Sequence, residues 1–222
     1  MEIFPDVHWL DLGISNVYLA ADADGLTLVD AGMLRQTRKI LSSIARLGYQ
    51  PDALRRIVIT HADIDHAGSL AALVQATGAA VYAGSPTAAL LRHGRSPEHM
   101  PGMMQFLAGL FRYGAVAEVN EVADGDELPC LGGLRVIAAP GHTLEHHAFF
   151  SPSTGVLFAG DALNTRQDRL NLTPKPITAD MALARQSARL LLNLRPRLFA
   201  CGHGRPLRDL PANDLARFLE EV

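Results

Sequence analysis

Residues 60–68 read THADIDHAG and place two histidines and two aspartates within six consecutive positions, 61–66. They directly follow RRIVI (55–59), a short apolar run of the kind that forms a buried strand. Imidazole and carboxylate groups are costly to bury without partners, and both are good metal ligands. The stretch therefore predicts a metal site at the end of a strand.

Three later stretches repeat this arrangement. His142 lies in APGHT, Asp161 in FAGDAL and His203 in ACGHG, each after a strand-like run and beside a glycine that permits a tight turn. One such histidine or aspartate alone would usually be a surface or turn residue. Four clusters in this order favour two divalent ions that share a bridging ligand, with zinc first and iron or manganese as alternatives. The predicted metal ligands are His61, Asp63, Asp65, His66, His142, Asp161 and His203.

The remaining histidines divide into two groups. His8, His93 and His99 are expected to be ordinary polar surface residues. His146 and His147 are adjacent, so they point to opposite faces if HHAFF is a strand. One of the two could face the metal site, and the sequence leaves open which.

Composition and charge narrow the class of protein. The chain has 222 residues, 48% hydrophobic and 19% charged, with a net charge of −3 and no basic block. This argues against nucleic-acid and membrane partners, which call for a positive surface. Two distant cysteines, an N-terminus without signal-peptide features and the lack of a long apolar run favour a cytoplasmic protein. We expect one domain over residues 1–222, a small-molecule substrate, and leave a homodimer open.

The hydrophobic pattern predicts two strand-rich halves, each with helices, rather than a regular alternation of strand and helix. Strands are expected at 16–20, 26–30, 55–59, 79–83, 132–139, 146–150, 155–159 and 197–200, and helices near 40–47, 69–78, 85–94, 179–194 and 211–222. The segment from about 93 to 114 is rich in Gly, Pro and Met and interrupts the strands. Within it, MPGMMQFLAGLF (100–111) predicts a helix with an apolar face formed by Met103, Phe106, Leu107, Leu110 and Phe111. We interpret this helix as a lid over the site. The alternative is a helix packed on the body or in a dimer interface.

With these motifs in order, the sequence resembles the metallo-β-lactamase fold superfamily over nearly its whole length. SNVYLAADADGLTLVDAG (15–32) is similar to the family's opening hairpin, and THADIDHAG to its His-x-His-x-Asp-His signature, with Asp63 in place of the second histidine. PGHT, GDAL and GHG match the later ligand motifs. The resemblance implies an α/β (α+β) fold, a four-layer αβ/βα sandwich of two mixed β-sheets with helices on the outer faces.

The resemblance also assigns roles to residues. It implies a first ion on His61, position 63 and His142, and a second ion on Asp65, His66 and His203. Asp161 would bridge the ions, Asp65 would be the catalytic residue that orients the nucleophile and carries its proton, and Asp30 would support a ligand histidine.

The implied activity is a metal-dependent hydrolase that uses a metal-bound hydroxide on a lactone, carboxylic ester or thioester. The nuclease and flavodiiron branches of the family carry additional domains for which this chain has no room. A metal-binding redox or persulfide-processing member, or a phosphodiesterase, remains the alternative.

Asp63 is the departure from the family pattern. A carboxylate there adds negative charge and hardens the first site, which favours iron or manganese relative to three histidines. We expect Asp63 to be a true ligand. The alternative is an empty or weakly filled first site.

Overall fold

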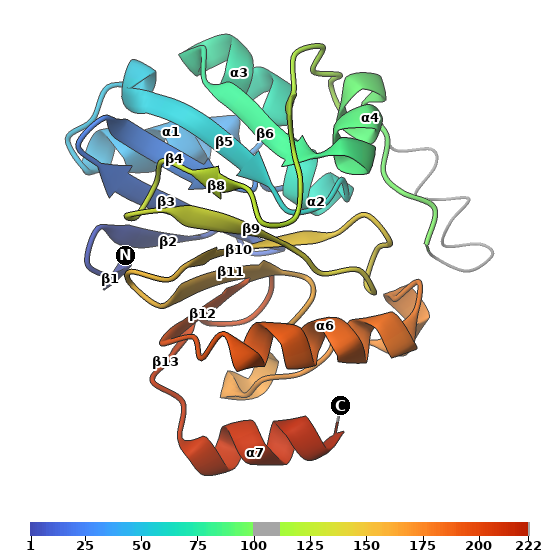
Figure 1. Ribbon diagram of the computed structural model, residues 1–222. Coiled ribbons are helices and arrows are strands. Elements are labelled where there is room, and N and C mark those ends of the chain that lie inside the picture. The colour runs from blue at the N-terminus through green and yellow to red at the C-terminus, as the bar shows by residue number, and fades with distance from the viewer. Residues whose placement is uncertain (100–111, 222) are drawn as a thin grey trace. The chain divides into compact units, whose positions relative to one another are not determined.

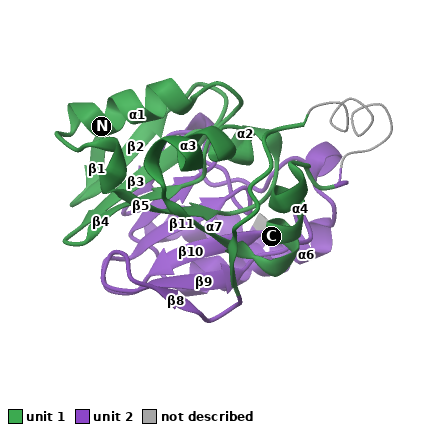
Figure 2. Ribbon diagram, turned by 90° about the horizontal axis from the view of Figure 1, so that it is seen from above, with its two compact units in different colours: residues 1–97, 106–122 green, residues 98–105, 123–222 purple. Residues whose placement is uncertain are grey.

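The computed structural model describes residues 1–99 and 112–221. The apolar segment 100–111 of the proposed lid (about 93–114) lies outside the described residues, as do the five apolar residues assigned to its helical face. The chain divides into two compact units, shown in Figure 2: unit 1 is Met1–Pro97 with Phe106–Val122, and unit 2 is Glu98–Gln105 with Ala123–Val222. The single-domain organisation stays a prediction.

Unit 1 contains a seven-stranded mixed sheet in the order β1-β2-β3-β4-β5-β6-β7 (Figure 1). The first four strands pair antiparallel and the last four pair parallel, with β4 in both sets. The strands are β1 Glu2–Phe4, β2 Val7–Asp11, β3 Asn16–Asp22, β4 Gly25–Val29, β5 Leu54–Ile59, β6 Ala80–Gly84 and β7 Asn120–Val122. Parallel neighbours end at the same edge of a sheet, so the residues after β4 and β5 lie close together.

Within the described residues, four α-helices connect these strands: α1 Thr37–Arg46, α2 Ile64–Ala67, α3 Leu70–Thr77 and α4 Ser85–His93, with a short 3-10 helix at Pro51–Ala53. Gly78 and Gly94 end α3 and α4 in the left-handed conformation that glycine adopts most easily. The apolar face of α1, with Ile40 and Ile44, is fully buried in the same core as the interior strands β4 and β5. Strand β5 is therefore a well-packed base for the residues that follow it.

Unit 2 contains a six-stranded mixed sheet in the order β13-β12-β11-β10-β9-β8. Its strands are β8 Glu127–Leu128, β9 Leu134–Ala138, β10 His147–Ser151, β11 Val156–Gly160, β12 Leu198–Cys201 and β13 Leu207–Arg208. All pairs are antiparallel except β11 with β12. The carboxyl ends of β9, β11 and β12 and the amino end of β10 consequently share one edge of this sheet.

Helices α6 Met181–Asn193 and α7 Ala212–Glu221 also belong to unit 2, with 3-10 turns at Arg166–Asp168 and Lys175–Ile177. The Asp180 carboxylate caps α6 by accepting the backbone N–H groups of Ala182 and Leu183 at 2.8 and 3.0 Å. Ala188 and Leu191 of α6 belong to the core formed on β10, β11 and β12.

The two mixed sheets with their helices confirm the predicted fold class. Every strand and helix predicted within the described residues is present within a few residues of its expected bounds. Strands β1, β2, β7, β8 and β13 and helix α2 were not predicted. All but β2 have four residues or fewer, too short for a periodic pattern to be recognised. No helix in the described parts of the chain is both long and apolar enough to cross a membrane.

Candidate metal centre

Unit 1 presents four of the predicted ligands directly after β5. His61 follows the strand, Asp63 precedes α2, and Asp65 and His66 lie in that short helix. His61 and His66 are fully buried, Asp63 is buried, and Asp65 is partly exposed. Buried imidazole and carboxylate groups in this density require partners or a bound cation.

Asp30, directly after β4, organises this group. Its carboxylate accepts hydrogen bonds from the backbone N–H of Thr60 at 2.9 Å and from His66 Nδ1 at 2.8 Å. Because Nδ1 of His66 carries the proton for this bond, Nε2 has the lone pair that a metal ion needs. The role that the family resemblance implied for Asp30 therefore has a clear contact in unit 1.

Thr60 sets which ring nitrogen of His61 carries the proton, as Asp30 does for His66. Its hydroxyl lies 2.9 and 3.0 Å from the two Asp30 oxygens and 3.0 Å from His61 Nδ1. The hydroxyl has one proton, which it donates to the carboxylate, so it accepts the Nδ1 proton of His61. His61 thus also turns a lone pair on Nε2 toward the site. No sequence pattern singles out Thr60, because threonine is common after strands.

The donor spacing in unit 1 fits metal coordination. His61 Nε2 lies 3.5 Å from Asp63 Oδ2, and His66 Nε2 lies 3.8 Å from Asp65 Oδ2. Both separations exceed an ordinary hydrogen bond. Two donors at about 2.1 Å on one tetrahedral ion stand about 3.4 Å apart. The pairs therefore group His61 with Asp63 and His66 with Asp65, as the family pattern implies.

Asp63 is not explained as a helix cap. It occupies the N-cap position of α2, yet its side chain makes no cap hydrogen bond there. Its Oδ2 approaches His61 Nε2 instead. This favours a ligand role for the carboxylate over a purely local structural one.

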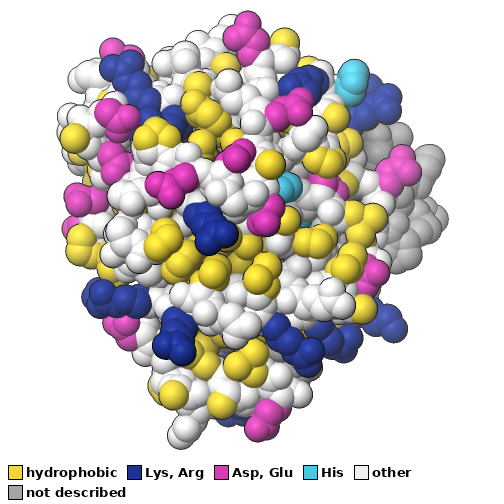
Figure 3. All heavy atoms as spheres, viewed as in Figure 1, with side chains coloured by type: hydrophobic (Ala, Val, Ile, Leu, Met, Phe, Trp, Pro, Cys, Tyr) yellow, Lys and Arg dark blue, Asp and Glu magenta, His cyan; other side chains and the backbone are white. Residues whose placement is uncertain are grey.

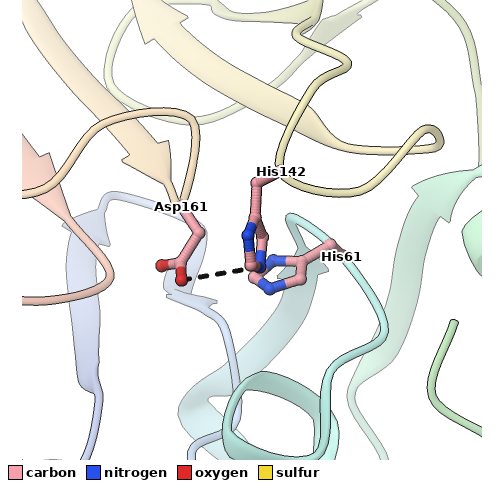
Figure 4. A group of neighbouring side chains, drawn as sticks. All are labelled: His61, His142 and Asp161. Carbon is pink, nitrogen blue, oxygen red and sulfur yellow. Dashed lines mark ion pairs between the residues drawn. The ribbon is translucent and has the colours of Figure 1, made fainter. Parts of the chain in front are cut away.

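Unit 2 presents the other three predicted ligands at one edge of its sheet. His142 follows β9, Asp161 follows β11 and His203 follows β12. One oxygen of Asp161, Oδ2, lies 3.7 Å from His142 Nε2 and 3.2 Å from His203 Nε2. Figure 4 shows the His142–Asp161 pair; His61, also drawn there, comes from the end of β5 in unit 1. A single oxygen close to two imidazoles is the arrangement expected of a bridging carboxylate.

Helix α6 fixes the loop that carries His142. The backbone N–H groups of Ala179 and Asp180 donate to the carbonyls of His142 and Gly141 at 2.9 and 3.0 Å. At Gly141, where φ is +148°, an added Cβ would lie 2.4 Å from the backbone of Ala184. Only glycine allows α6 to approach this closely, so the loop position depends on it.

His146 resolves the choice that the sequence left open. It is buried, and its Nε2 accepts the backbone N–H of Asp161 at 3.0 Å. His146 is therefore the neighbour of the ligand loop, and its accepting nitrogen makes it a positioning residue for Asp161. His147 instead lies 2.9 Å from the Glu145 carbonyl through Nδ1, and burial lowers its pKa.

His99 and Cys201 also belong to unit 2. His99 was expected at the surface, but it is only partly exposed, and its ring contacts the His142 ring edge-to-face with centroids 4.9 Å apart. That expectation was wrong because the contact joins distant parts of the sequence. Cys201 is fully buried, and burial raises the pKa of its thiol far above the usual range, which favours the neutral thiol.

Comparison with known proteins identifies the family of the chain. The family model of the metallo-beta-lactamase superfamily matches residues 10–203. The chain is 27% identical to the probable metallo-hydrolase YflN of Bacillus subtilis, covering 90% of this chain and 84% of that protein. It is 39% identical to the hydroxyacylglutathione hydrolase of Rhodobacter capsulatus over 111 residues, which cover 50% of this chain and 34% of that one.

A solved B3 metallo-beta-lactamase with an active-site glutamic acid superposes with a TM-score of 0.77 at 24% identity, over 99% of this chain and 85% of that one. This likeness shows the fold. The chain belongs to the metallo-beta-lactamase superfamily. It is an enzyme of that superfamily, a metal-dependent hydrolase.

Proposed function

We propose that the protein hydrolyses a small ester-like substrate, a lactone, carboxylic ester or thioester, with two divalent metal ions. The observation that carries the proposal is the Asp161 Oδ2 atom, 3.2–3.7 Å from Nε2 of both His142 and His203. The matching pairs in unit 1 support it, because each imidazole there has its own carboxylate at 3.5–3.8 Å.

The family's ligand pattern distributes these residues between the two ions. The first ion would be held by His61, Asp63 and His142, and the second by Asp65, His66 and His203, with Asp161 on both. Four imidazoles and three carboxylates suit zinc, and the additional carboxylate of Asp63 makes iron or manganese more competitive.

When bound, the ions would acidify a water toward a pKa of about 7 and polarise the scissile carbonyl. Asp65 is the residue suited to handle protons. Its side chain is 22% exposed, so it can exchange protons with solvent, while its Oδ2 lies near His66. It would take the proton of the attacking water and return it to the leaving oxygen or sulfur. Ser15 holds it in place by donating to the Asp65 carbonyl.

The substrate class rests on two observations. The chain shares 39% identity with a hydroxyacylglutathione hydrolase over half its length, which favours a thioester among the three candidates. A shallow surface hollow in unit 2 lies beside His99, with Glu98, Leu144, Lys175 and Thr178 among its lining residues. A hollow with apolar walls and charged groups of both signs suits a small acyl compound with a polar end.

The surface charge favours a small-molecule substrate as well. The net charge is −3 and the sequence has no basic block. On the face seen in Figure 3, both basic and acidic side chains are present. We include a cytoplasmic location in the proposal.

A hydrolysis screen tests the proposal. Wild-type protein, Asp161→Ala and the exposed control Asp52→Ala are loaded with zinc, iron or manganese and assayed on lactones, aryl esters, thioesters and phosphodiesters. We expect turnover of an ester-like compound by wild type and the control, and almost none by Asp161→Ala or after chelation. Turnover that requires oxygen and iron, or that is confined to phosphodiesters, would overturn the substrate class in favour of the alternatives.

A further inference from the structure

His99 belongs to none of the ligand motifs of the family, yet it lies against one of the proposed ligands. Its ring and that of His142, both in unit 2, have centroids 4.9 Å apart and planes inclined by 70°. His99 is partly buried, whereas His93, six residues earlier, is exposed. The segment between them therefore directs one histidine toward His142 and the other toward solvent.

The spacing of the two rings fits a shared ion. A ring nitrogen bonded at about 2.1 Å places the imidazole centroid about 3.2 Å from the metal, so two imidazoles on one tetrahedral ion have centroids about 5 Å apart. The observed 4.9 Å agrees. His61 and His66 in unit 1 provide a contrast, because their centroids are 4.1 Å apart. That separation is too short for one tetrahedral ion and is consistent with ligands of two neighbouring ions.

The chemistry of the first site supplies the reason for an additional imidazole. In the family signature the second position is a histidine, and here it is Asp63. His61 and His142 alone would leave the first ion with two imidazoles and an excess of carboxylate. A neutral imidazole adds a donor without adding charge, which restores the preference of the site for zinc.

We propose that His99 ligates the first ion beside His142 and supplies the imidazole that Asp63 replaces in the signature. This inference rests on the proposed two-ion function. It assigns a ligand that the sequence motifs do not contain.

An edge-to-face contact of two aromatic rings without metal would have the same spacing, because such pairs range from about 4.5 to 7 Å. The test must therefore separate ligation from stacking. His99→Phe keeps an aromatic ring against His142 but removes both nitrogens. His99→Ala removes the ring, and His93→Ala is the matched control at an exposed position.

The full chain is titrated with zinc against a chromophoric chelator, and the visible spectrum of the cobalt-loaded protein is recorded. We expect His99→Ala and His99→Phe to bind one of two zinc ions at least about tenfold more weakly, with the other unchanged, and to alter the cobalt spectrum. His93→Ala should match wild type in both measurements.

If wild type binds two zinc ions and His99→Phe matches it in affinity and spectrum, His99 only stacks on His142 and this inference is wrong while the proposed function stands. If wild-type protein binds no zinc, cobalt, iron or manganese, the proposed function fails and the inference fails with it.

Discussion

Replacing Asp30 by asparagine changes one oxygen to an amide nitrogen at nearly constant size. In wild type the carboxylate accepts from the Thr60 N–H, the Thr60 hydroxyl and His66 Nδ1. An asparagine oxygen that keeps the Thr60 N–H bond turns its NH₂ group toward His66. Because that group only donates, His66 must move its proton to Nε2, the nitrogen proposed to bind the metal.

The expected loss of metal affinity follows from the loss of the hydrogen bond between Asp30 and His66. Removing a residue that orients a ligand histidine costs about 10–100-fold in metal affinity, or about 1.4–2.7 kcal/mol. Asp30→Ala removes the acceptor of all three donors, so the metal-free protein should also lose about 1.5–3 kcal/mol of its free energy of unfolding. Asp30→Asn should lose less, because the Thr60 N–H bond survives.

Zinc affinity is measured by chelator competition, and the free energy of unfolding by urea titration of the metal-free protein. Asp52→Asn, at an exposed position, is the control and should bind zinc as wild type does. Wild-type zinc affinity in Asp30→Asn would refute the reasoning, since it would show that Asp30 does not set the proton position on His66.

Three further outcomes are expected. Asp63→His should raise the zinc affinity, measured by chelator competition. Unchanged zinc affinity in both Asp63→His and Asp63→Ala would show that Asp63 is no ligand. Gly141→Ala should lower the urea midpoint of the metal-free protein by the equivalent of about 1–3 kcal/mol, because its Cβ meets Ala184 at 2.4 Å; an unchanged midpoint would contradict this close packing. Cys130 and Cys201 are buried, and the raised pKa of Cys201 keeps it a neutral thiol. A colorimetric disulfide reagent at pH 8 should therefore react with neither cysteine until the chain unfolds. Reaction of Cys201 in the folded protein would contradict its burial.

The candidate ligand positions could be selected from the sequence because they follow recognisable strands. Runs such as RRIVI and GVLFA are apolar enough to indicate buried strands, and the ends of parallel strands meet at one edge. That local signal was sufficient to select His61, Asp161 and His203 before any contact was known. The grouping of His61 with Asp63 was implied by family resemblance and agrees with their 3.5 Å separation.

What the sequence could not provide depends on distant contacts. His99 follows Pro97 and Glu98 without a preceding strand, and its approach to His142 joins positions 43 residues apart (142 − 99). The choice between His146 and His147 required the start of β10, since a shift of one residue reverses the face. Thr60 acquires its role only because β4 pairs with β5 and brings Asp30 beside it.

Elemental analysis of the zinc-loaded, gel-filtered protein tests the central claim most directly, with ester and thioester hydrolysis measured on the same samples. We expect about two zinc ions per wild-type chain, fewer in Asp161→Ala, and turnover that disappears with the metal. Absence of retained metal, or full turnover after exhaustive chelation, would contradict it.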